Sequence, residues 1–347
     1  MKFEILSEPR KIYAKMLGDI RRAKRAVFLE TYNYAKDEIG RKFRDVLVKK
    51  AEAGVEVKVL VDAWASGVDK NFFKKLVDAG GEVRFFREFK YVVRIFGANH
   101  ERDHRKLLLV DDEVSYIGSI NVTRKGIDWD ELVLRLGDNL GGTLRMSFMQ
   151  SWRQFDKRVS RRVRSYLYKG FKVINDVPRK FSRSGKSYRK LIRGAKKEVL
   201  IETPYLIPPI WIRRALRRAV KKGVSVKIVL PRRSELKLVD IVRGRYLGGL
   251  YKAGVEIYFY PKMSHAKLLI VDDEFFILGS SNLDYRSFMH QFEVNLLGSD
   301  KKMVGELRKY FGGHLKKSKG FSYEAWKNRH IVKRIVEVLL RPVRKYF

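Results

Sequence analysis

Short apolar runs alternate with longer amphipathic stretches along this chain of 347 residues. The short runs, such as 107–110 and 268–271, are rich in Leu, Ile and Val and predict buried strands. Stretches with apolar residues every three or four positions predict helices over 11–23, 38–53, 70–78, 188–196, 210–221 and 239–252. Strands that alternate with helices indicate an α/β fold with mixed, largely parallel sheets flanked by helices.

The order of these elements occurs twice, and several segments recur with it. Residues 28–32 (FLETY) reappear as 200–205 (LIETPY), and residues 53–60 (AGVEVKVL) reappear as 222–229 (KGVSVKIV). A period of about 170 residues is too long for a solenoid and indicates two similar domains. The predicted organisation is an N-terminal domain over 1–150, a basic helical connector over 151–170, and a C-terminal domain over 171–347 that ends in a basic amphipathic helix over 323–347.

One motif is present once in each domain with identical spacing. Each copy reads H-x-K-x4-D-x6-G-S-x-N, and its polar members are His104, Lys106, Asp111, Ser119 and Asn121 in the first domain and His265, Lys267, Asp272, Ser280 and Asn282 in the second. Because strand residues two apart share a face, the His and Lys of each copy point the same way. A turn that pairs Asp111 with Val114 would place Lys106 opposite Ser119. The same turn in the second copy would place Lys267 opposite Ser280. For either copy alone, the alternative is a core hairpin with a hydrogen-bonded structural histidine.

Two histidines and two lysines around one site suit the chemistry of a phosphodiester. One imidazole can attack phosphorus and form a phosphohistidine, while the other donates a proton to the leaving oxygen and later accepts one from the incoming hydroxyl. Lys106 and Lys267 supply positive charge for the phosphoryl oxygens, and Asn121 and Asn282 supply neutral hydrogen bonds. The sequence offers no clear carboxylate cage, so we expect neither a metal ion nor another cofactor.

Each catalytic imidazole also needs an anion on its second nitrogen. Glu131 and Glu293 follow the two histidines at nearly equal distances, on strand-like segments, and we assign each to the histidine of its own repeat. Surface salt bridges are the alternative for these glutamates. Asp111 and Asp272 lie at the turn ends of the hairpins, so we expect structural roles for them and for the motif serines Ser119 and Ser280.

The carboxyl ends of sheet strands are where ligands bind in α/β folds. Two equivalent segments end such strands, one in each domain. We therefore expect substrate-binding residues among Glu30, Thr31, Tyr32, Glu202, Thr203 and Tyr205.

Charge and apolar segments limit the possible partners. The chain has 76 Lys and Arg against 39 Asp and Glu, a formal net charge of +37, which favours polyanions such as nucleic acid or an anionic membrane surface. No cysteine is present, and neither a signal peptide nor an apolar stretch of about 18 residues is apparent. We expect peripheral attachment to the cytoplasmic face of the cell membrane. The candidate contacts are the connector, the C-terminal helix, and an insert before the first motif that contains Phe89, Tyr91, Val92, Val93, Ile95 and Phe96. Packing of the insert or of the helix within the protein is the alternative.

The two H-x-K-x4-D motifs with G-S-x-N resemble the signature of the phospholipase D superfamily. Residues 203–208 (TPYLIP), 279–288 (GSSNLDYRSF) and 292–296 (FEVNL) are similar to those of bacterial cardiolipin synthases. The resemblance implies two domains packed with pseudo-two-fold symmetry around one active site, no metal, and a phosphatidyl-histidine intermediate on the N-terminal motif. His104 would then be the nucleophile and His265 the proton donor. The chain departs from many cardiolipin synthases because it lacks two N-terminal transmembrane helices.

Two functions remain open at this point. The first is a phosphatidyltransferase that makes cardiolipin from phosphatidylglycerol and a second phospholipid. The second is a metal-independent nuclease or nucleic-acid phosphodiesterase with the same catalytic core. The apolar and aromatic insert favours the lipid, because acyl chains need an apolar channel, whereas a nuclease groove stacks bases on exposed aromatic side chains. No specific protein partner is expected.

Overall fold

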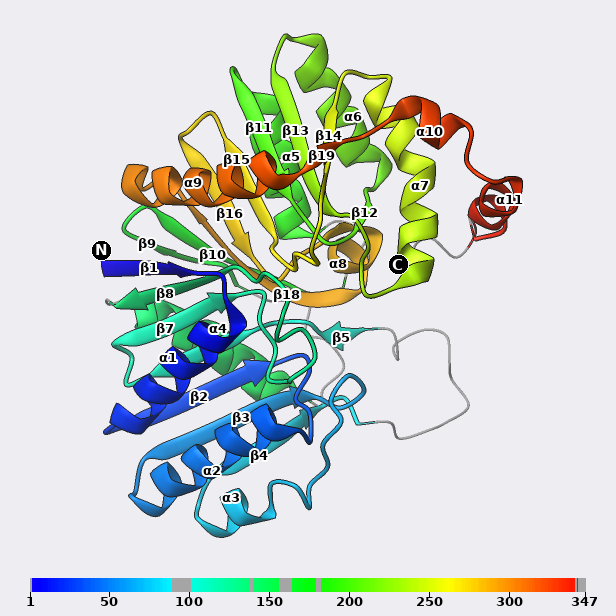
Figure 1. Ribbon diagram of the computed structural model, residues 1–347. Helices are drawn as coiled ribbons and strands as arrows, with labels where there is room; N and C mark the ends of the chain where they lie inside the picture. Colours follow the sequence, from blue (N-terminus) through cyan, green and yellow to red (C-terminus); the bar gives the residue numbers. More distant parts are fainter. Residues whose placement is uncertain are drawn as a thin grey trace.

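The computed structural model describes residues 2–88, 101–137, 140–155, 164–178, 182–340 and 342 of the chain. Two α/β halves lie against each other, with the N-terminal half below the C-terminal half in Figure 1. Each half is built on one main sheet, as the repeated pattern predicts.

The sheet of the N-terminal half has seven strands. Their order is β1 (Lys2–Leu6), β8 (Val133–Gly137), β7 (Val114–Gly118), β6 (Leu107–Val110), β2 (Ala26–Thr31), β3 (Glu56–Asp62) and β4 (Glu82–Phe86). Its outer face packs against α1 (Pro9–Arg22), α2 (Glu38–Glu52) and α3 (Lys74–Asp78). Its inner face packs against α4 (Leu140–Gln154) and against the other half.

The sheet of the C-terminal half repeats this plan. Its order is β19 (Lys319–Gly320), β14 (Glu256–Tyr260), β13 (Ser225–Pro231), β11 (Glu198–Glu202), β15 (Leu268–Val271), β16 (Phe275–Gly279), β18 (Gln291–Gly298), β10 (Phe171–Asp176) and β9 (Tyr166–Tyr168), with β5 (Arg102–Asp103) of the N-terminal half paired to β18. The outer face packs against α5 (Arg183–Gly194), α6 (Ile210–Lys221) and α7 (Lys237–Tyr251). The inner face packs against α9 (Lys301–Lys317). The remaining elements are β12 (Leu206–Ile207), β17 (Leu283–Asp284), α8 (Tyr285–Met289), α10 (Tyr323–Lys327) and α11 (Ile331–Leu339).

The mixed α/β class is confirmed, but the predominance of parallel pairing is not. In the two main sheets, parallel pairs within a half are confined to β2–β3–β4 and β11–β13–β14. The motif strands β6 and β7, and likewise β15 and β16, are antiparallel because a tight turn joins them. Strands β8 and β18 then add antiparallel beside these hairpins.

The motif hairpins differ from the predicted register by one residue. Leu107 pairs with Ile117, and Leu268 pairs with Leu278, because three residues separate the last paired positions of each hairpin. The first turn residues, Asp111 and Asp272, both have φ of 56°, and the aspartates after them also have positive φ. Two successive residues with positive φ give the turn that suits the twist of a hairpin. Since a shift of one residue reverses the facing of side chains, the predicted pairing of Lys106 with Ser119 is wrong.

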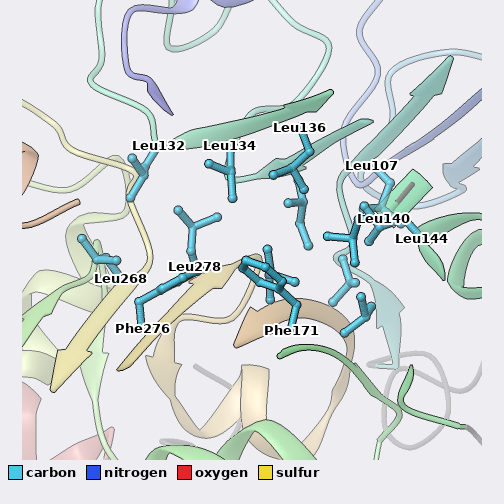
Figure 2. Packing of buried hydrophobic residues seen from close by; sticks show 14 of the residues in the cluster. Leu107, Leu132, Leu134, Leu136, Leu140, Leu144, Phe171, Leu268, Phe276 and Leu278 are labelled. Carbon is cyan, nitrogen blue, oxygen red and sulfur yellow. The ribbon is translucent and has the colours of Figure 1, made fainter. Parts of the chain in front are cut away.

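One apolar core spans the boundary between the halves. Leu134 and Leu136 of β8 lie over Phe276 and Leu278 of β16, and Phe171 of β10 closes the layer (Figure 2). All five side chains are at least 95% buried, and each contributes roughly 1.5–3 kcal/mol when fully buried. The halves therefore form one body whose internal boundary is as apolar as a domain core.

Two expected helices differ from the structure. α4 ends at Gln154 and β9 begins at Tyr166, so the later part of the connector expected over 151–170 is strand and turn. The C-terminal segment is broken into α10 and α11, because residues 328–330 leave the helix between them. The insert with Phe89, Tyr91, Val92, Val93, Ile95 and Phe96 lies outside the described residues. Among the helices described, none has the length and apolar character needed to cross a membrane.

Candidate active site

A cavity of about 360 Å³ lies where the two halves meet. Both motif histidines and both motif asparagines line it, together with aromatic, charged and apolar side chains from each half. Its walls include His104, His265, Asn121, Asn282, Glu131, Tyr13, Tyr32, Trp64, Trp129, Tyr205, Lys125, Glu235 and Arg286. The structure thus brings the two motifs, 161 positions apart in the numbering of their histidines, to a single site.

Each histidine is held by the glutamate of the opposite half. His104 Nδ1 lies 3.2 Å from both carboxylate oxygens of Glu293. His265 Nδ1 lies 3.2 and 3.1 Å from the two oxygens of Glu131. The prediction that each glutamate serves the histidine of its own repeat is therefore wrong. Because Nδ1 of each ring is engaged, Nε2 is the nitrogen left for chemistry at the cavity.

Backbone hydrogen bonds explain this exchange of partners. The His104 amide donates to the carbonyl of Phe292 at 2.9 Å, and the His265 amide donates to the carbonyl of Asp130 at 2.7 Å. Phe292 and Asp130 immediately precede Glu293 and Glu131. Each histidine is thus fixed through its main chain and its ring to one short segment of the other half, so the site forms only when the halves pack.

The motif serines lie behind the glutamates. The Ser119 hydroxyl donates to Glu131, and the Ser280 hydroxyl donates to Glu293. The preceding glycines allow this approach, because a Cβ on Gly118 would lie 2.3 Å from the carbonyl oxygen of Leu132, and Gly279 is similarly crowded. The result is a Ser–Glu–His chain that runs from each half into the other.

The motif lysines are buried and turn back toward their own strands. Lys106 Nζ donates to the His104 carbonyl at 2.6 Å, and Lys267 Nζ donates to the His265 carbonyl at 2.7 Å. Burial lowers the pKa of Lys106 to about 8 and that of Lys267 to about 7. Neither amino group is among those that line the cavity, but both lie within electrostatic range of His104.

The two histidine–glutamate pairs have different charges. Burial raises the pKa of Glu293 to about 8, although Lys106 and Ser280 act against it. Burial would also raise the pKa of Glu131, but His265, Lys267 and Ser119 hold it below the ordinary value. Burial, helped by Lys106 and Lys267, keeps the pKa of His104 well below its ordinary range. Burial and Lys267 lower the pKa of His265 as well, but Glu131 acts against them through its charge and its hydrogen bond. The ionised Glu131 is therefore the better partner for a protonated imidazole, and the Glu293 side favours a neutral one.

The motif asparagines differ in their hydrogen bonds. Asn121 Oδ1 accepts from the amide of Asn33 at 3.3 Å. Asn282 Oδ1 is buried without a hydrogen-bond partner among the residues described. A buried polar atom without a partner is costly unless a ligand or water completes its bonding. The Asn282 amide is thus a polar group on the cavity wall that a bound substrate or water could satisfy.

The motif aspartates lie away from the cavity. Asp111 accepts hydrogen bonds at 2.7–2.8 Å from the amides of Lys24, Arg25 and Ala26. Asp272 accepts three equivalent bonds from the amides of residues 196–198. These bonds tie each hairpin turn to the loop that precedes the central strand of its sheet.

Of the six candidate substrate-binding residues, only Tyr32 and Tyr205 line the cavity. Glu30 and Glu202 are buried behind the histidine strands, where Glu202 binds Ser264 and His314, and Glu30 lies 3.8 Å from Arg105. Thr31 and Thr203 bond to nearby main-chain groups, namely Asn33 O for Thr31 and Tyr205 O and Leu283 N for Thr203. The rule that ligands bind at strand ends located the right edge, but the side chains that reach the cavity come one or more residues later.

Sequence reasoning missed several groups of the site. The Trp129 ring lies 5.9 Å from that of His265, much as the Tyr32 ring lies 4.8 Å from that of His104. Trp64 follows β3, so the strand-end rule could have found it. Lys125 and Glu235 carry no repeated signal. Among the residues described, no group of three or more His, Cys, Asp or Glu side chains could hold a metal ion.

Comparison with known proteins agrees with this architecture. Residues 16–155 and 188–315 match the family model described as cardiolipin synthase, PLD-like domain. The chain is 33% identical over 361 residues to the major cardiolipin synthase of Bacillus subtilis, covering 98% of this chain and 75% of that protein. It is 30% identical to cardiolipin synthase 1 of Staphylococcus aureus, over 96% of this chain and 71% of that protein.

Solved structures share the fold at much lower identity. A phosphatidylserine synthase of Haemophilus influenzae superimposes with a TM-score of 0.79 at 14% identity, over 99% of this chain and 95% of its own. The two matched ranges of the family model coincide with the two halves that share the His104 and His265 site. The chain therefore belongs to the cardiolipin synthase family with phospholipase D-like domains.

Proposed function

We propose that this protein is a phosphatidyltransferase that makes cardiolipin from phosphatidylglycerol and a second phospholipid. The observation that carries the proposal is the pair of imidazoles in one cavity, each anchored through Nδ1 to a buried glutamate. The family relationship supports the lipid substrate, because the matched relatives are named cardiolipin synthases.

In the first step, His104 Nε2 attacks phosphorus and forms a P–N bond. The bond between phosphorus and the oxygen of the leaving headgroup breaks, and His265 gives its proton to that oxygen. The lower pKa of Glu131 supports this assignment, because an ionised Glu131 stabilises the imidazolium of His265. Burial keeps the pKa of His104 low, so His104 stays neutral, as a nucleophile must.

In the second step, His265 takes the proton of the acceptor hydroxyl as its oxygen attacks phosphorus. The P–N bond breaks, and His104 returns to its neutral form. Lys106 and Lys267 stabilise the charge of the phosphoryl group, and the amides of Asn121 and Asn282 complete its hydrogen bonds. Positive charge for the phosphoryl group thus comes from these side chains and from protonated imidazole.

The lipid is reached by peripheral binding to an anionic membrane surface, which we place at the cytoplasmic face. Helix α11 supports this part of the proposal, since Ile331, Val332, Ile335, Val338 and Leu339 form one apolar stripe and are each more than half exposed. α11 packs against α7, and Leu236, just before α7, lines the cavity. The net charge of +37 complements anionic lipid.

The test is an assay of purified protein with labelled phosphatidylglycerol vesicles and, in parallel, with plasmid DNA, both in excess chelator. Cardiolipin formation by the wild type and none by His104→Ala is the expected result. DNA cleavage that depends on His104, without lipid turnover, would establish the nuclease alternative. Lipid turnover that requires an added divalent ion, with vesicles otherwise unaffected, would contradict the metal-independent mechanism.

A further inference from the structure

An ionised carboxylate lies on the wall of a cavity that handles anions. Glu235 follows β13, lines the cavity with His265, and its side chain is only 20% exposed. Lys125 of the N-terminal half reaches across and places Nζ 2.7 Å from Glu235 Oε2. The hydroxyl of Tyr205 donates to Glu235 Oε1 at 2.8 Å. Glu235 is thus fixed in position by one partner from each half.

Electrostatics keep Glu235 charged in this setting. Burial would raise the pKa of Glu235, but Lys125, His265 and Tyr205 together hold it below the ordinary value. The interaction with His265 also shows that the carboxylate lies within electrostatic range of the imidazole that is to act as the base. Glu235 and His265 therefore line the same cavity within electrostatic range of each other.

A carboxylate here repels the phosphate that the lysines and histidines attract. Its favourable ligand is a hydrogen-bond donor, and an ionised carboxylate has about four acceptor positions. The contacts with Lys125 and Tyr205 use one position on each oxygen, so each retains capacity for a further donor. The donor that must come beside His265 in the proposed second step is the hydroxyl group of the acceptor.

We propose that Glu235, held by Lys125 and Tyr205, is the acceptor subsite and binds the non-reacting hydroxyl of a vicinal diol. The terminal hydroxyl of the diol gives its proton to His265 and attacks phosphorus, while its neighbour donates a hydrogen bond to Glu235. A glycerol headgroup has this chemistry, whereas water and simple alcohols do not. The inference rests on the proposed function, because it assumes transfer from a phosphohistidine to an alcohol.

The subsite explains how transfer can prevail over hydrolysis in an open cavity. Water reaches the intermediate at high concentration, so a competing alcohol needs a bound orientation. A charge-assisted hydrogen bond from the neighbouring hydroxyl supplies that orientation, and a vicinal diol has the spacing to make it. Glu235 is therefore a specificity-determining residue, and His265 remains the group that moves the proton.

The experiment measures how the intermediate partitions between alcohols and water. Wild-type protein and Glu235→Ala are given phosphatidylglycerol in detergent micelles with isotopically labelled glycerol, 1,3-propanediol or 1-propanol. Labelled lipid reports transfer to the alcohol, and phosphatidic acid reports hydrolysis. For the wild type, we expect preference for glycerol over both other alcohols. In Glu235→Ala, the glycerol-to-water ratio should fall roughly tenfold or more, since a hydrogen bond to a charged group is lost.

Two further variants keep the result interpretable. Glu235→Gln retains an acceptor oxygen and should restore part of the preference, which mere loss of structure would not do. Glu306→Ala removes an exposed glutamate that pairs with Lys309 on α9, and it should behave as the wild type. Thermal unfolding of each variant separates misfolding from altered partitioning.

The outcomes distinguish the two proposals. If the wild type transfers the phosphatidyl group to no alcohol and makes no cardiolipin, the proposed function fails. If the wild type transfers but shows no preference for glycerol, or if folded Glu235→Ala keeps that preference, the acceptor subsite is wrong while the function stands.

Discussion

His104 and His265 have chemically identical partners, yet their surroundings are not equivalent. Glu131 is held ionised beside His265, whereas burial raises the pKa of Glu293 beside His104 to about 8. Two sequence repeats thus produce one site with two roles. The asymmetry comes from the neighbours of each glutamate and not from the motif itself.

Removal of either imidazole should separate the two roles. His104→Ala and His265→Ala should each lower turnover by about three orders of magnitude or more, because each loses a covalent or a proton-transfer step. With an activated aryl phosphodiester, whose leaving group needs no proton, His265→Ala should still form a phosphohistidine. Mass spectrometry of the trapped protein checks this. A label on His265 in the His104→Ala variant would reverse the assignment, and a tenth of wild-type turnover in His104→Ala would refute it.

The two buried lysines predict an alkaline limit on activity. Burial lowers the pKa of Lys106 to about 8 and of Lys267 to about 7, so each loses its positive charge as the pH rises through that value. In free enzyme, kcat/KM for a soluble phosphodiester should therefore fall above about pH 7–8, far below the ordinary lysine range. A steady-state profile from pH 5.5 to 10 measures it. A flat profile up to pH 9.5 would show that the lysines remain charged.

At this scale the sequence predicted the chemical groups but not their pairing. The spacing of the two motifs identified both histidines, both lysines and the glutamates that hold Nδ1. Nearly equal spacing in both repeats is compatible with Glu131 serving either histidine, and the choice depends on how the halves pack. Trp129, Lys125 and Glu235 come from loops whose paths no periodicity fixes, so only the folded chain shows them at the cavity.

The motif hairpins show the same limit at the scale of elements. Short apolar runs predicted β6, β7, β15 and β16. The turn contained one more residue than expected, which reversed the facing of the predicted pairs. The aspartates at the turns are not among the residues that line the cavity. Their role depends on amides of the α1–β2 and α5–β11 loops, which are distant in sequence.

Loss of one motif aspartate should loosen its hairpin. Asp272→Ala removes three hydrogen bonds to the amides of residues 196–198 and leaves alanine at φ of 56°. We expect the free energy of unfolding to fall by about 2–3 kcal/mol. This figure is smaller than the sum for three buried hydrogen bonds because the carboxylate is partly exposed. Urea denaturation followed by fluorescence measures the loss. Asp272→Asn, which tolerates positive φ and retains an acceptor, should recover part of it, whereas equal losses would contradict this role.

Across the whole molecule, the site exists only because the halves share a core. The His104 amide hydrogen-bonds to the residue before Glu293, and the His265 amide to the residue before Glu131, so each bond crosses from one half to the other. The repeat in the sequence predicted two domains, but it did not predict that one core runs through both. A strand face that packs against a helix is as apolar as one that packs against another domain, so the sequence does not distinguish them. A half on its own would lack the glutamate that orients its histidine.

Helix α11 packs against α7, beside which it lies in Figure 1, and its exposed apolar stripe suits a membrane-facing surface. The variant Ile335→Ser with Val338→Ser removes two side chains that are 51% and 59% exposed, so folding should be preserved. Each buries apolar area in lipid, and their joint loss should weaken vesicle binding about tenfold or more. Electrostatic attraction should remain, because no charge changes.

Co-sedimentation with vesicles of phosphatidylglycerol and phosphatidylcholine, across a salt series, tests this prediction. Wild-type protein should bind anionic vesicles, largely leave neutral ones, and retain some binding at 1 M salt, where the Debye length is about 3 Å and charge is screened. The double variant should lose that residual binding and its lipid turnover, yet hydrolyse a soluble phosphodiester normally. Val77→Ser, at an α3 side chain with 52% exposure, is the matched control and should bind as the wild type. Unchanged high-salt binding of the double variant would show that α11 does not enter the lipid, and equal binding to neutral vesicles would remove the electrostatic part.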